Sequence, residues 1–214
     1  MNRIEFIRRN TSIMSPPLVP EIKLHLAHEA VPLWQKTEDE LGEMGLPPPF
    51  WAFAWAGGQA LARYVLDNPA IVKSLKVLDL ATGSGLVAIA AAKSGSSHVT
   101  AADIDAFATT AARLNAELNQ AVVDIKLENL FNAPPQAFDV ILVGDLFYEK
   151  TVAERCLAWL RRAGGATVLI GDPGRSYLPQ DALEKLAEYN VPVTRDLEDA
   201  EIKRGAVWRL ARNC

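Results

Sequence analysis

A glycine-containing loop is the segment best suited to binding a small molecule. In residues 77–88 an apolar run typical of a buried strand passes through Gly83 and Gly85 into an alanine-rich helical pattern. Glycine lets backbone N–H groups approach a ligand closely, and a helix N-terminus carries partial positive charge. Asp103 lies 20 residues beyond Gly83, at the end of the next strand pattern, where a carboxylate can accept hydrogen bonds from ribose hydroxyls. The loop therefore predicts a nucleotide-type cofactor site.

Two classes of cofactor fit this loop. The spacing Gly83-x-Gly85-x-x-Ala88 satisfies the dinucleotide fingerprint, with alanine at its last position. Asp79, at the end of the first strand pattern, would repel the pyrophosphate of NAD or FAD, whereas the sulfonium and α-ammonium groups of S-adenosylmethionine would be attracted to it. We therefore favour S-adenosylmethionine. Two alternatives stay open, because local backbone donors could satisfy Asp79 and because Asp103 could be a turn residue.

Asp145 and Tyr148 follow the fourth strand pattern and are candidates for the acceptor side of a reaction. Ligands of open α/β sheets bind outside the carboxyl ends of the strands, near the point where strand order reverses, so we expect both residues to share a crevice with the glycine loop. A carboxylate and a phenol there can dock an amine and aim its lone pair at a methyl carbon. In the alternative interpretation Asp145 caps the next helix, with Phe147 and Tyr148 packed beneath it.

Composition excludes several classes of protein. At 214 residues, half of them hydrophobic, the chain predicts one ordinary domain. We expect a cytoplasmic protein without a membrane segment, because no apolar run approaches about 18 residues and the N-terminus lacks a signal-peptide core. The net charge of −4 argues against a nucleic-acid partner.

No metal site or disulfide is expected. Cys156 and Cys214 are far apart in sequence, which predicts free thiols. His25 and His28 lie three residues apart on a predicted helix, but no third ligand is nearby in sequence, so a structural role is favoured over a metal site.

Strand and helix patterns alternate from residue 76 onward, which predicts a parallel sheet with helices on both faces. The predicted strands are 77–80, 98–103, 122–127, 138–144 and 166–171, and the predicted helices are 86–94, 106–119, 151–162 and 180–190. Two final strands, at 191–195 and 206–210, are expected to pair antiparallel. The predicted fold is α/β, with a Rossmann-like seven-stranded sheet that is mostly parallel and whose last strand is antiparallel.

Residues 1–75 have another character and predict an N-terminal helical cap on the core formed by residues 76–214, the two together making one domain. Helices are expected at 21–31 and 60–66. The aromatic run at 50–55 either packs the cap or forms a wall of the ligand site, and Gly57-Gly58 after it favours the ligand wall slightly, because paired glycines let the backbone approach a flat or charged group.

Three segments together resemble a known family. The glycine loop, Asp103 and the Asp-Leu-Phe-Tyr sequence at 145–148 resemble the class I (seven-β-strand) S-adenosylmethionine methyltransferases. The sequences PPPFWAFAWAGGQAL at 47–61, LATGSGL at 80–86 and GDPGR at 171–175 resemble, more narrowly, the electron transfer flavoprotein β-subunit lysine methyltransferases. The resemblance extends from about residue 20 to residue 210. One departure is Ala81, where the superfamily loop usually begins with glycine.

The resemblance implies S-adenosylmethionine as cofactor and assigns roles to individual residues. The implied cofactor contacts are Asp79, Ala81, Gly83 and Gly85 on the methionine half, Asp103 on the ribose, Asn129 and Leu130 near the adenine, Trp55 from the cap, and Asp145. Asp145 and Tyr148 would hold the target amine, and the 171–175 turn would form part of the substrate rim. The alternatives are a plain turn role for Asn129 and a solvated loop charge for Arg175.

The resemblance further implies a protein-lysine N-methyltransferase whose protein substrate is the electron transfer flavoprotein β-subunit. Methyl transfer would be a direct displacement, in which the lysine must first lose a proton, because at a pKa of about 10.4 only about one lysine in 2,500 is neutral at pH 7. The alternatives are a small-molecule or another protein N-methyltransferase, for instance of the ribosomal-protein type. Less favoured are a nucleic-acid amino-methyltransferase, an NAD-dependent oxidoreductase and a non-enzymatic adaptor.

Overall fold

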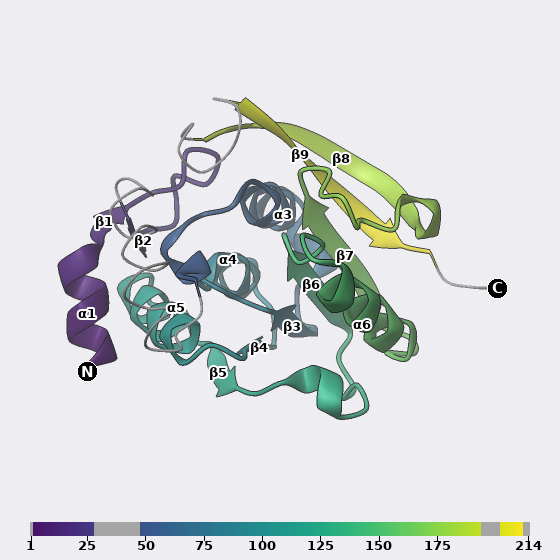
Figure 1. Cartoon of the computed structure of the whole chain (residues 1–214), viewed down its shortest axis with the longest axis horizontal. Helices are drawn as coiled ribbons and strands as arrows, with labels where there is room; N and C mark the ends of the chain where they lie inside the picture. Colours follow the sequence, from purple (N-terminus) through teal and green to yellow (C-terminus); the bar gives the residue numbers. More distant parts are fainter. Residues whose placement is uncertain (1, 28–47, 194–201, 212–214) are drawn as a thin grey trace.

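The computed structural model describes residues 2–27, 48–193 and 202–211, and its centre is a seven-stranded sheet (Figure 1). The order of the strands is β5-β4-β3-β6-β7-β9-β8. The parallel strands are β3 (Lys76–Leu80), β4 (His98–Asp103), β5 (Asp124–Leu127), β6 (Val140–Gly144) and β7 (Thr167–Asp172). The last strand, β9 (Ile202–Leu210), is antiparallel to both β7 and β8 (Leu183–Pro192). The predicted seven-stranded, mostly parallel sheet is confirmed.

Helices cover both faces of this sheet because side chains alternate along its strands (Figure 1). Val77 of β3 packs in one apolar cluster with α3 (Ala56–Asp67) and α4 (Leu86–Lys93), whereas the next residue, Leu78, packs in another with α6 (Lys150–Arg161). Helix α5 (Ala106–Leu118) lies beside α4 over β4 and β5. The predicted helices 86–94, 106–119 and 151–162 match α4, α5 and α6 to within one residue at each end, and the predicted helix 60–66 lies within α3.

The predicted helix at 180–190 is wrong. Residues 183–192 form the edge strand β8, which follows a short 3-10 helix, Gln180–Ala182. Alanine, leucine and glutamate favour a helix in isolation, but β9 offers an unpaired strand edge, and ten residues of β8 lie along it. Only the first two residues of the predicted strand 191–195 belong to β8, and its last two lie outside the described residues.

The predicted helix at 21–31 is also wrong in the part that the structure describes. Leu24–Leu26 form strand β2, which pairs antiparallel with β1 (Ser12–Met14). Leu24 and Leu26 are buried with His25 between them, and this alternation is the period of a strand. His25 Nδ1 lies 3.2 Å from Thr11 Oγ1, and burial lowers the pKa of the imidazole. His28 lies outside the described residues. The N-terminal region therefore combines α1 (Arg3–Asn10), this hairpin and α3 rather than helices alone.

Glycines allow α3 to lie directly against the sheet. A Cβ on Gly171, in β7, would collide with the carbonyl oxygen of Gly57 and lie 2.7 Å from Leu61 Cβ. A Cβ on Gly144, in β6, would lie 3.2 Å from Gly58 Cα. The first turn of α3 thus touches the carboxyl ends of β6 and β7 with no side chain between them. Gly57 and Gly58 serve this packing, and a further role in a ligand wall stays a prediction.

Two aromatic residues of the 50–55 run are core residues. Trp51 and Phe53 are buried in an apolar cluster with Phe107 and Leu114 of α5, and the rings of Trp51 and Phe107 stack at 6.1 Å between centroids. This part of the run packs the N-terminal region onto the core, as one of the two interpretations of the sequence expects.

The contact between α3 and β7 predicts that Gly171→Ala is strongly destabilising. The added methyl group has no room between two backbones, so we expect a loss of about 3 kcal/mol in the free energy of unfolding, at the upper end of overpacking effects. Gly164→Ala is the matched control, since a Cβ there meets no atom closer than 4.0 Å, and we expect a change within about 0.5 kcal/mol. Urea unfolding measures both; equal stabilities would contradict the packing.

Candidate active site

The glycine loop and Asp145 lie at the carboxyl ends of two neighbouring strands. The loop follows β3 and Asp145 follows β6, and these strands pair in parallel from Val77↔Val140 to Leu80↔Val143. Strand order reverses here, since β4 and β5 continue on one side of β3 while β6 and β7 lie on the other. The two motifs therefore lie at the carboxyl ends of neighbouring strands, which is where open α/β sheets bind ligands.

Three loop residues adopt left-handed backbone conformations: Ala81 at φ 56°, Gly83 at φ 53° and Gly85 at φ 82°. Gly85 is also required sterically, because a Cβ there would lie 3.0 Å from Ala112 Cα in α5. A Cβ on Gly83 would meet no atom within 4 Å, so this turn faces open space. This conformation costs a residue with a Cβ, such as Ala81, about 1–2 kcal/mol.

Asp79 lies beneath the loop and is 1% exposed. Its Oδ2 accepts hydrogen bonds from Thr82 Oγ1 at 2.5 Å and from the Ala88 N–H at 2.9 Å. Burial raises the pKa of this carboxyl to about 7; the two hydrogen bonds oppose that shift, and the charge of Asp103 adds to it. Local donors therefore hold Asp79, which is one of the two interpretations that the sequence left open.

Asp103 organises the same loop from the end of β4. Its Oδ2 accepts from the Gly83 N–H and its Oδ1 from the Asp105 N–H, both at 3.0 Å. Burial raises its pKa. A carboxylate has about four lone-pair sites, so both oxygens keep capacity for further donors such as ribose hydroxyls. The next residue, Ile104, is 71% exposed. Ile104 is not among the site residues predicted from the sequence, where the available signal was an apolar residue directly after a strand-ending acid.

Asn129 and Leu130 follow β5 at the same edge. The Asn129 side chain accepts from the Phe131 N–H at 3.1 Å and so begins the short 3-10 helix Leu130–Asn132. Leu130 is buried in the apolar cluster that also holds Leu78 of β3. Asn129 thus fills the turn role that was its alternative interpretation, and its predicted contact with adenine stays a prediction.

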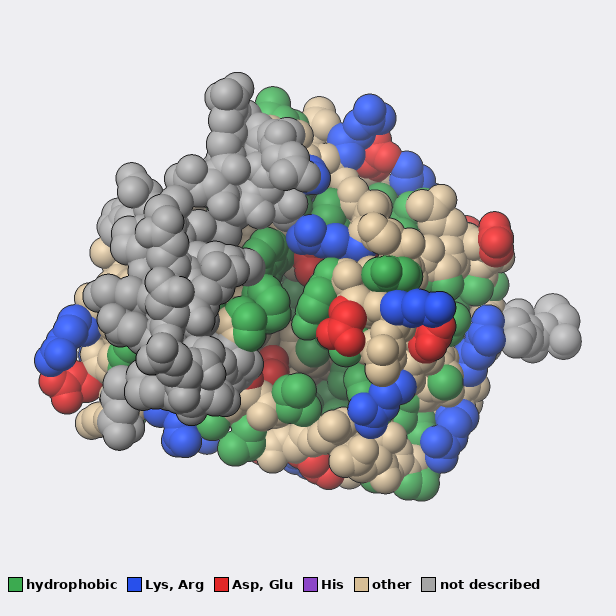
Figure 2. Space-filling model, viewed as in Figure 1, with side chains coloured by type: hydrophobic (Ala, Val, Ile, Leu, Met, Phe, Trp, Pro, Cys, Tyr) green, Lys and Arg blue, Asp and Glu red, His purple; other side chains and the backbone are tan. Residues whose placement is uncertain are grey.

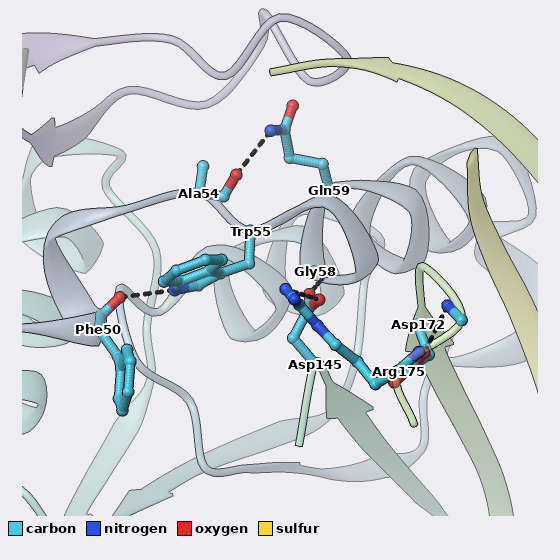
Figure 3. A network of polar contacts seen from close by, with 9 residues as sticks. Phe50, Ala54, Trp55, Gly58, Gln59, Asp145, Asp172 and Arg175 are labelled. Carbon is cyan, nitrogen blue, oxygen red and sulfur yellow. Dashed lines mark hydrogen bonds and ion pairs between the residues drawn. The ribbon is translucent and has the colours of Figure 1, made fainter. Parts of the chain in front are cut away.

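Asp145 caps α3, although it lies 87 residues away from its partner in sequence (Figure 3). Its Oδ2 accepts from the Gly58 N–H at 2.7 Å, within the first turn of α3, where the helix dipole favours negative charge. Its Oδ1 lies 3.4 Å from Arg175 Nη2, and its φ of 51° is left-handed. The alternative that Asp145 caps the following helix is wrong, because α6 begins after Glu149. Phe147 is fully buried, as that alternative expected, but Tyr148 is 45% exposed.

Aromatic rings connect Tyr148 with Trp55 beside Asp145. The Phe50 ring lies 5.5 Å from that of Tyr148 and 5.9 Å from that of Trp55, and Trp55 Nε1 donates to the Phe50 carbonyl oxygen at 2.9 Å. Arg175 lies over the Trp55 ring, with its Cζ 5.5 Å from the centroid. Burial, then the charges of Glu149 and Asp103, raise the pKa of Tyr148. Phe50 is a further residue of this group that the sequence analysis did not single out.

The surface above this edge is hollowed in the view of Figure 2, where hydrophobic side chains surround a central depression and both acidic and basic side chains lie beside it. A second hollow, of about 410 Å³, lies at the opposite, amino ends of β4 and β5 and is lined by Lys93, His98 and Asp124 among others. None of the predicted site residues lines it.

Other candidate features carry no chemistry in the part of the chain that the structure describes. No three histidine, cysteine or acidic side chains are grouped there as metal ligands would be. Burial raises the pKa of the Cys156 thiol to about 12, so it is inert, and Cys214 lies outside the described residues. Within the same residues, no helix combines the length and the apolar character needed to cross a bilayer.

Comparison with known proteins finds relatives over nearly the whole chain. The electron transfer flavoprotein beta subunit lysine methyltransferase of Xenopus laevis is 41% identical over 211 residues, which cover 95% of this chain and 85% of that protein. The Homo sapiens protein of the same name is 37% identical over 212 residues, covering 95% and 80%. The family model described as ribosomal protein L11 methyltransferase (PrmA) matches residues 59–147.

Solved structures show the same fold. The ribosomal protein L11 methylase of Lactobacillus delbrueckii subsp. bulgaricus superposes with a TM-score of 0.52 at 24% identity, over 72% of this chain and 79% of that one. The magnesium protoporphyrin IX methyltransferase of Synechocystis PCC 6803, solved with bound SAM, gives a TM-score of 0.54 at 16% identity, over 72% and 80%.

The raised pKa of Asp79 predicts a pH-dependent stability. The folded protein holds a proton on this carboxyl up to about pH 7, whereas the unfolded chain releases it near the ordinary value of 3.8. The folded state therefore loses stability as the pH rises between these two values. Asp79→Asn keeps an oxygen for both donors and removes the charge, so the thermal midpoint of this variant should fall less from pH 5 to pH 8 than that of the wild type, both without cofactor.

The exposed Asp181→Asn is the control and should keep the wild-type slope. Parallel curves for Asp79→Asn and the wild type would contradict the assignment, because Asp103 and Asp105, whose pKa values burial also raises, are present in both proteins.

Proposed function

Since this chain belongs to the electron transfer flavoprotein beta subunit lysine methyltransferase family, we propose that it transfers methyl groups from S-adenosylmethionine to lysine side chains of that flavoprotein subunit. The matches to these relatives extend over both the glycine loop and the segment that contains Asp145 and Tyr148. The observation that carries the proposal is the position of Asp145. Its carboxylate lies beside aromatic rings at the point where strand order reverses, and the strand before it is the neighbour of the strand that leads into the glycine loop.

The residues present fit S-adenosylmethionine. Gly83 turns toward open space, and Asp103 keeps acceptor capacity for ribose hydroxyls. Exposed Ile104 offers apolar surface for the adenine. The proposed cofactor-binding residues are Trp55, Asp79, Ala81, Gly83, Gly85, Asp103, Ile104, Asn129, Leu130 and Asp145. When bound, the cofactor supplies a methyl group made electrophilic by the sulfonium.

Asp79 contributes through charge rather than by contact. It is enclosed beneath the loop, where Thr82 and Ala88 hold it, so its carboxylate acts as a negative centre behind the backbone that faces the ligand. A cation bound at the loop favours the ionised form of Asp79 and Asp103, and these carboxylates favour the cation in return. The same two carboxylates would disfavour a pyrophosphate, which is why the NAD-dependent alternative is not adopted.

Asp145 and Tyr148 are the proposed acceptor residues. The Asp145 carboxylate docks the lysine ammonium, and the aromatic rings beside it flank the aliphatic stem. A carboxylate holds an amine in its protonated form, so Asp145 docks and orients the amine, which must lose its proton before attack. Tyr148 is exposed enough to meet a side chain presented by a protein.

The other candidate acceptors have weaker support. The match to the L11 methyltransferase model ends at residue 147 and so spans the glycine loop and Asp145 without the 171–175 turn; it supports methyl transfer but no particular substrate. The net charge of −4 disfavours nucleic acid. A cytoplasmic location stays a prediction from the sequence.

The test combines purified flavoprotein subunit with labelled S-adenosylmethionine. Wild-type enzyme should label lysine in that subunit. Asp145→Asn should lower kcat about 100-fold, since the amine loses its charged dock and its alignment. Asparagine tolerates the left-handed backbone and can accept from the Gly58 N–H, so the thermal midpoint should stay close to wild type.

Asp181→Asn should transfer at the wild-type rate. Label found only in small molecules or nucleic acid would refute the substrate, and an Asp145→Asn variant that turns over normally would refute the role of Asp145.

A further inference from the structure

Trp55 and Asp145 together form a binding place for a cation, and a side chain of this chain occupies it. The Arg175 guanidinium lies over the Trp55 ring, 5.5 Å from its centroid, while Nη2 is 3.4 Å from Asp145 Oδ1 (Figure 3). An aromatic face and a carboxylate are the two surfaces that attract a cation on a long aliphatic stem. The Asp145 side chain is 8% exposed and that of Arg175 is 24% exposed, so the pair lies just inside the surface.

The backbone of Arg175 is held independently of its side chain. Asp172, fully buried at the end of β7, accepts from the Gly174 N–H and the Arg175 N–H, each at 2.7 Å. Gly174 completes this turn at φ 93°. Because Asp172 anchors the backbone of this turn, rotation of the Arg175 side chain away from Asp145 requires no movement of the turn, the sheet or α3.

We propose that Arg175 is a placeholder, which occupies the acceptor position beside Asp145 and is displaced by the substrate lysine. The inference rests on the proposed lysine methyl transfer and adds to it the competition between two cations for one carboxylate. Arginine suits this role because its guanidinium keeps its proton at any physiological pH and so stays a counter-charge for Asp145, whereas a lysine in the same place can release the proton that attack requires.

The placeholder has a physical function in the enzyme without substrate. An almost fully buried carboxylate without a counter-charge is costly, and Arg175 supplies that charge until an ammonium replaces it. The substrate must therefore break this contact, and part of its binding energy is spent on doing so. Arg175 is therefore a positioning residue: it competes with the substrate lysine for Asp145 and so sets the affinity for the protein substrate, without touching the reacting atoms.

The test measures KM and kcat for the flavoprotein subunit with Arg175→Met, which keeps an apolar stem and removes the charge. We expect the KM to fall about tenfold, corresponding to about 1.4 kcal/mol, with kcat unchanged. Arg175→Gln should shift the KM in the same direction, and Arg175→Lys, which restores a cation, should return it toward wild type. The dissociation constant of the subunit, measured with S-adenosylhomocysteine present, should follow the KM.

Arg155→Met is the matched control, because Arg155 lies 5.7 Å from the Phe131 ring centroid and is not part of the site. Its KM should equal that of the wild type. If Arg175 only stabilises the fold, its Met and Gln variants will lower the thermal midpoint and leave the KM unchanged; if it binds the substrate directly, they will raise the KM. Either result overturns the placeholder. Absence of methylation by the wild type would instead refute the proposed function itself.

Discussion

The direct contact between α3 and the carboxyl ends of β6 and β7 is the constraint on which the site depends. Glycines on both sides let the first turn of α3 approach the sheet until the Gly58 N–H reaches Asp145. Asp145 is thereby fixed from two directions, by the helix and by its own left-handed backbone. Trp55 immediately precedes α3, so the same contact brings the aromatic side of the site to the carboxylate. Larger side chains in this layer would separate the two halves of the acceptor site.

The acidic side chains at the carboxyl ends of the strands lie at different positions relative to the glycine loop. Asp79 and Asp103 lie under and beside the glycine loop, where burial raises the pKa of both. Asp145 lies farther along the edge, with Arg175 as its counter-charge. The cofactor is a sulfonium and the lysine docks as an ammonium before it loses its proton, and separate carboxylates on neighbouring strands are available to these two cations. The rings of Phe50, Trp55 and Tyr148 add surfaces that accept a cation or an alkyl stem without further charge.

Local sequence patterns predicted the secondary structure correctly where the apolar residues follow one clear periodicity and no unpaired strand elsewhere competes for the segment. The strand, glycine loop and helix at residues 76–93 formed as expected, because glycine positions and apolar periodicity agree there. The same reasoning failed for residues 183–192, whose composition favours a helix but which lie along the unpaired edge of β9. It also failed for Leu24–Leu26, where a three-residue alternation was hidden by helix-forming neighbours. Tertiary pairing outweighs propensities of a few tenths of a kcal/mol per residue.

The sequence by itself determined the sheet type, the cofactor loop, and the presence of a carboxylate and a phenol after the fourth strand of the alternating series, because each depends on residues close together in the chain. Only the tertiary structure decided what those groups do for one another. Asp79 turned out to hold its own loop, Gly57-Gly58 to pack against β6 and β7, and Asp145 to cap a helix that begins 89 residues earlier while it faces Arg175. Apart from those of Asp79, these contacts join segments far apart in sequence, and hydrogen bonds and close packing at such distances leave no periodic trace in the chain.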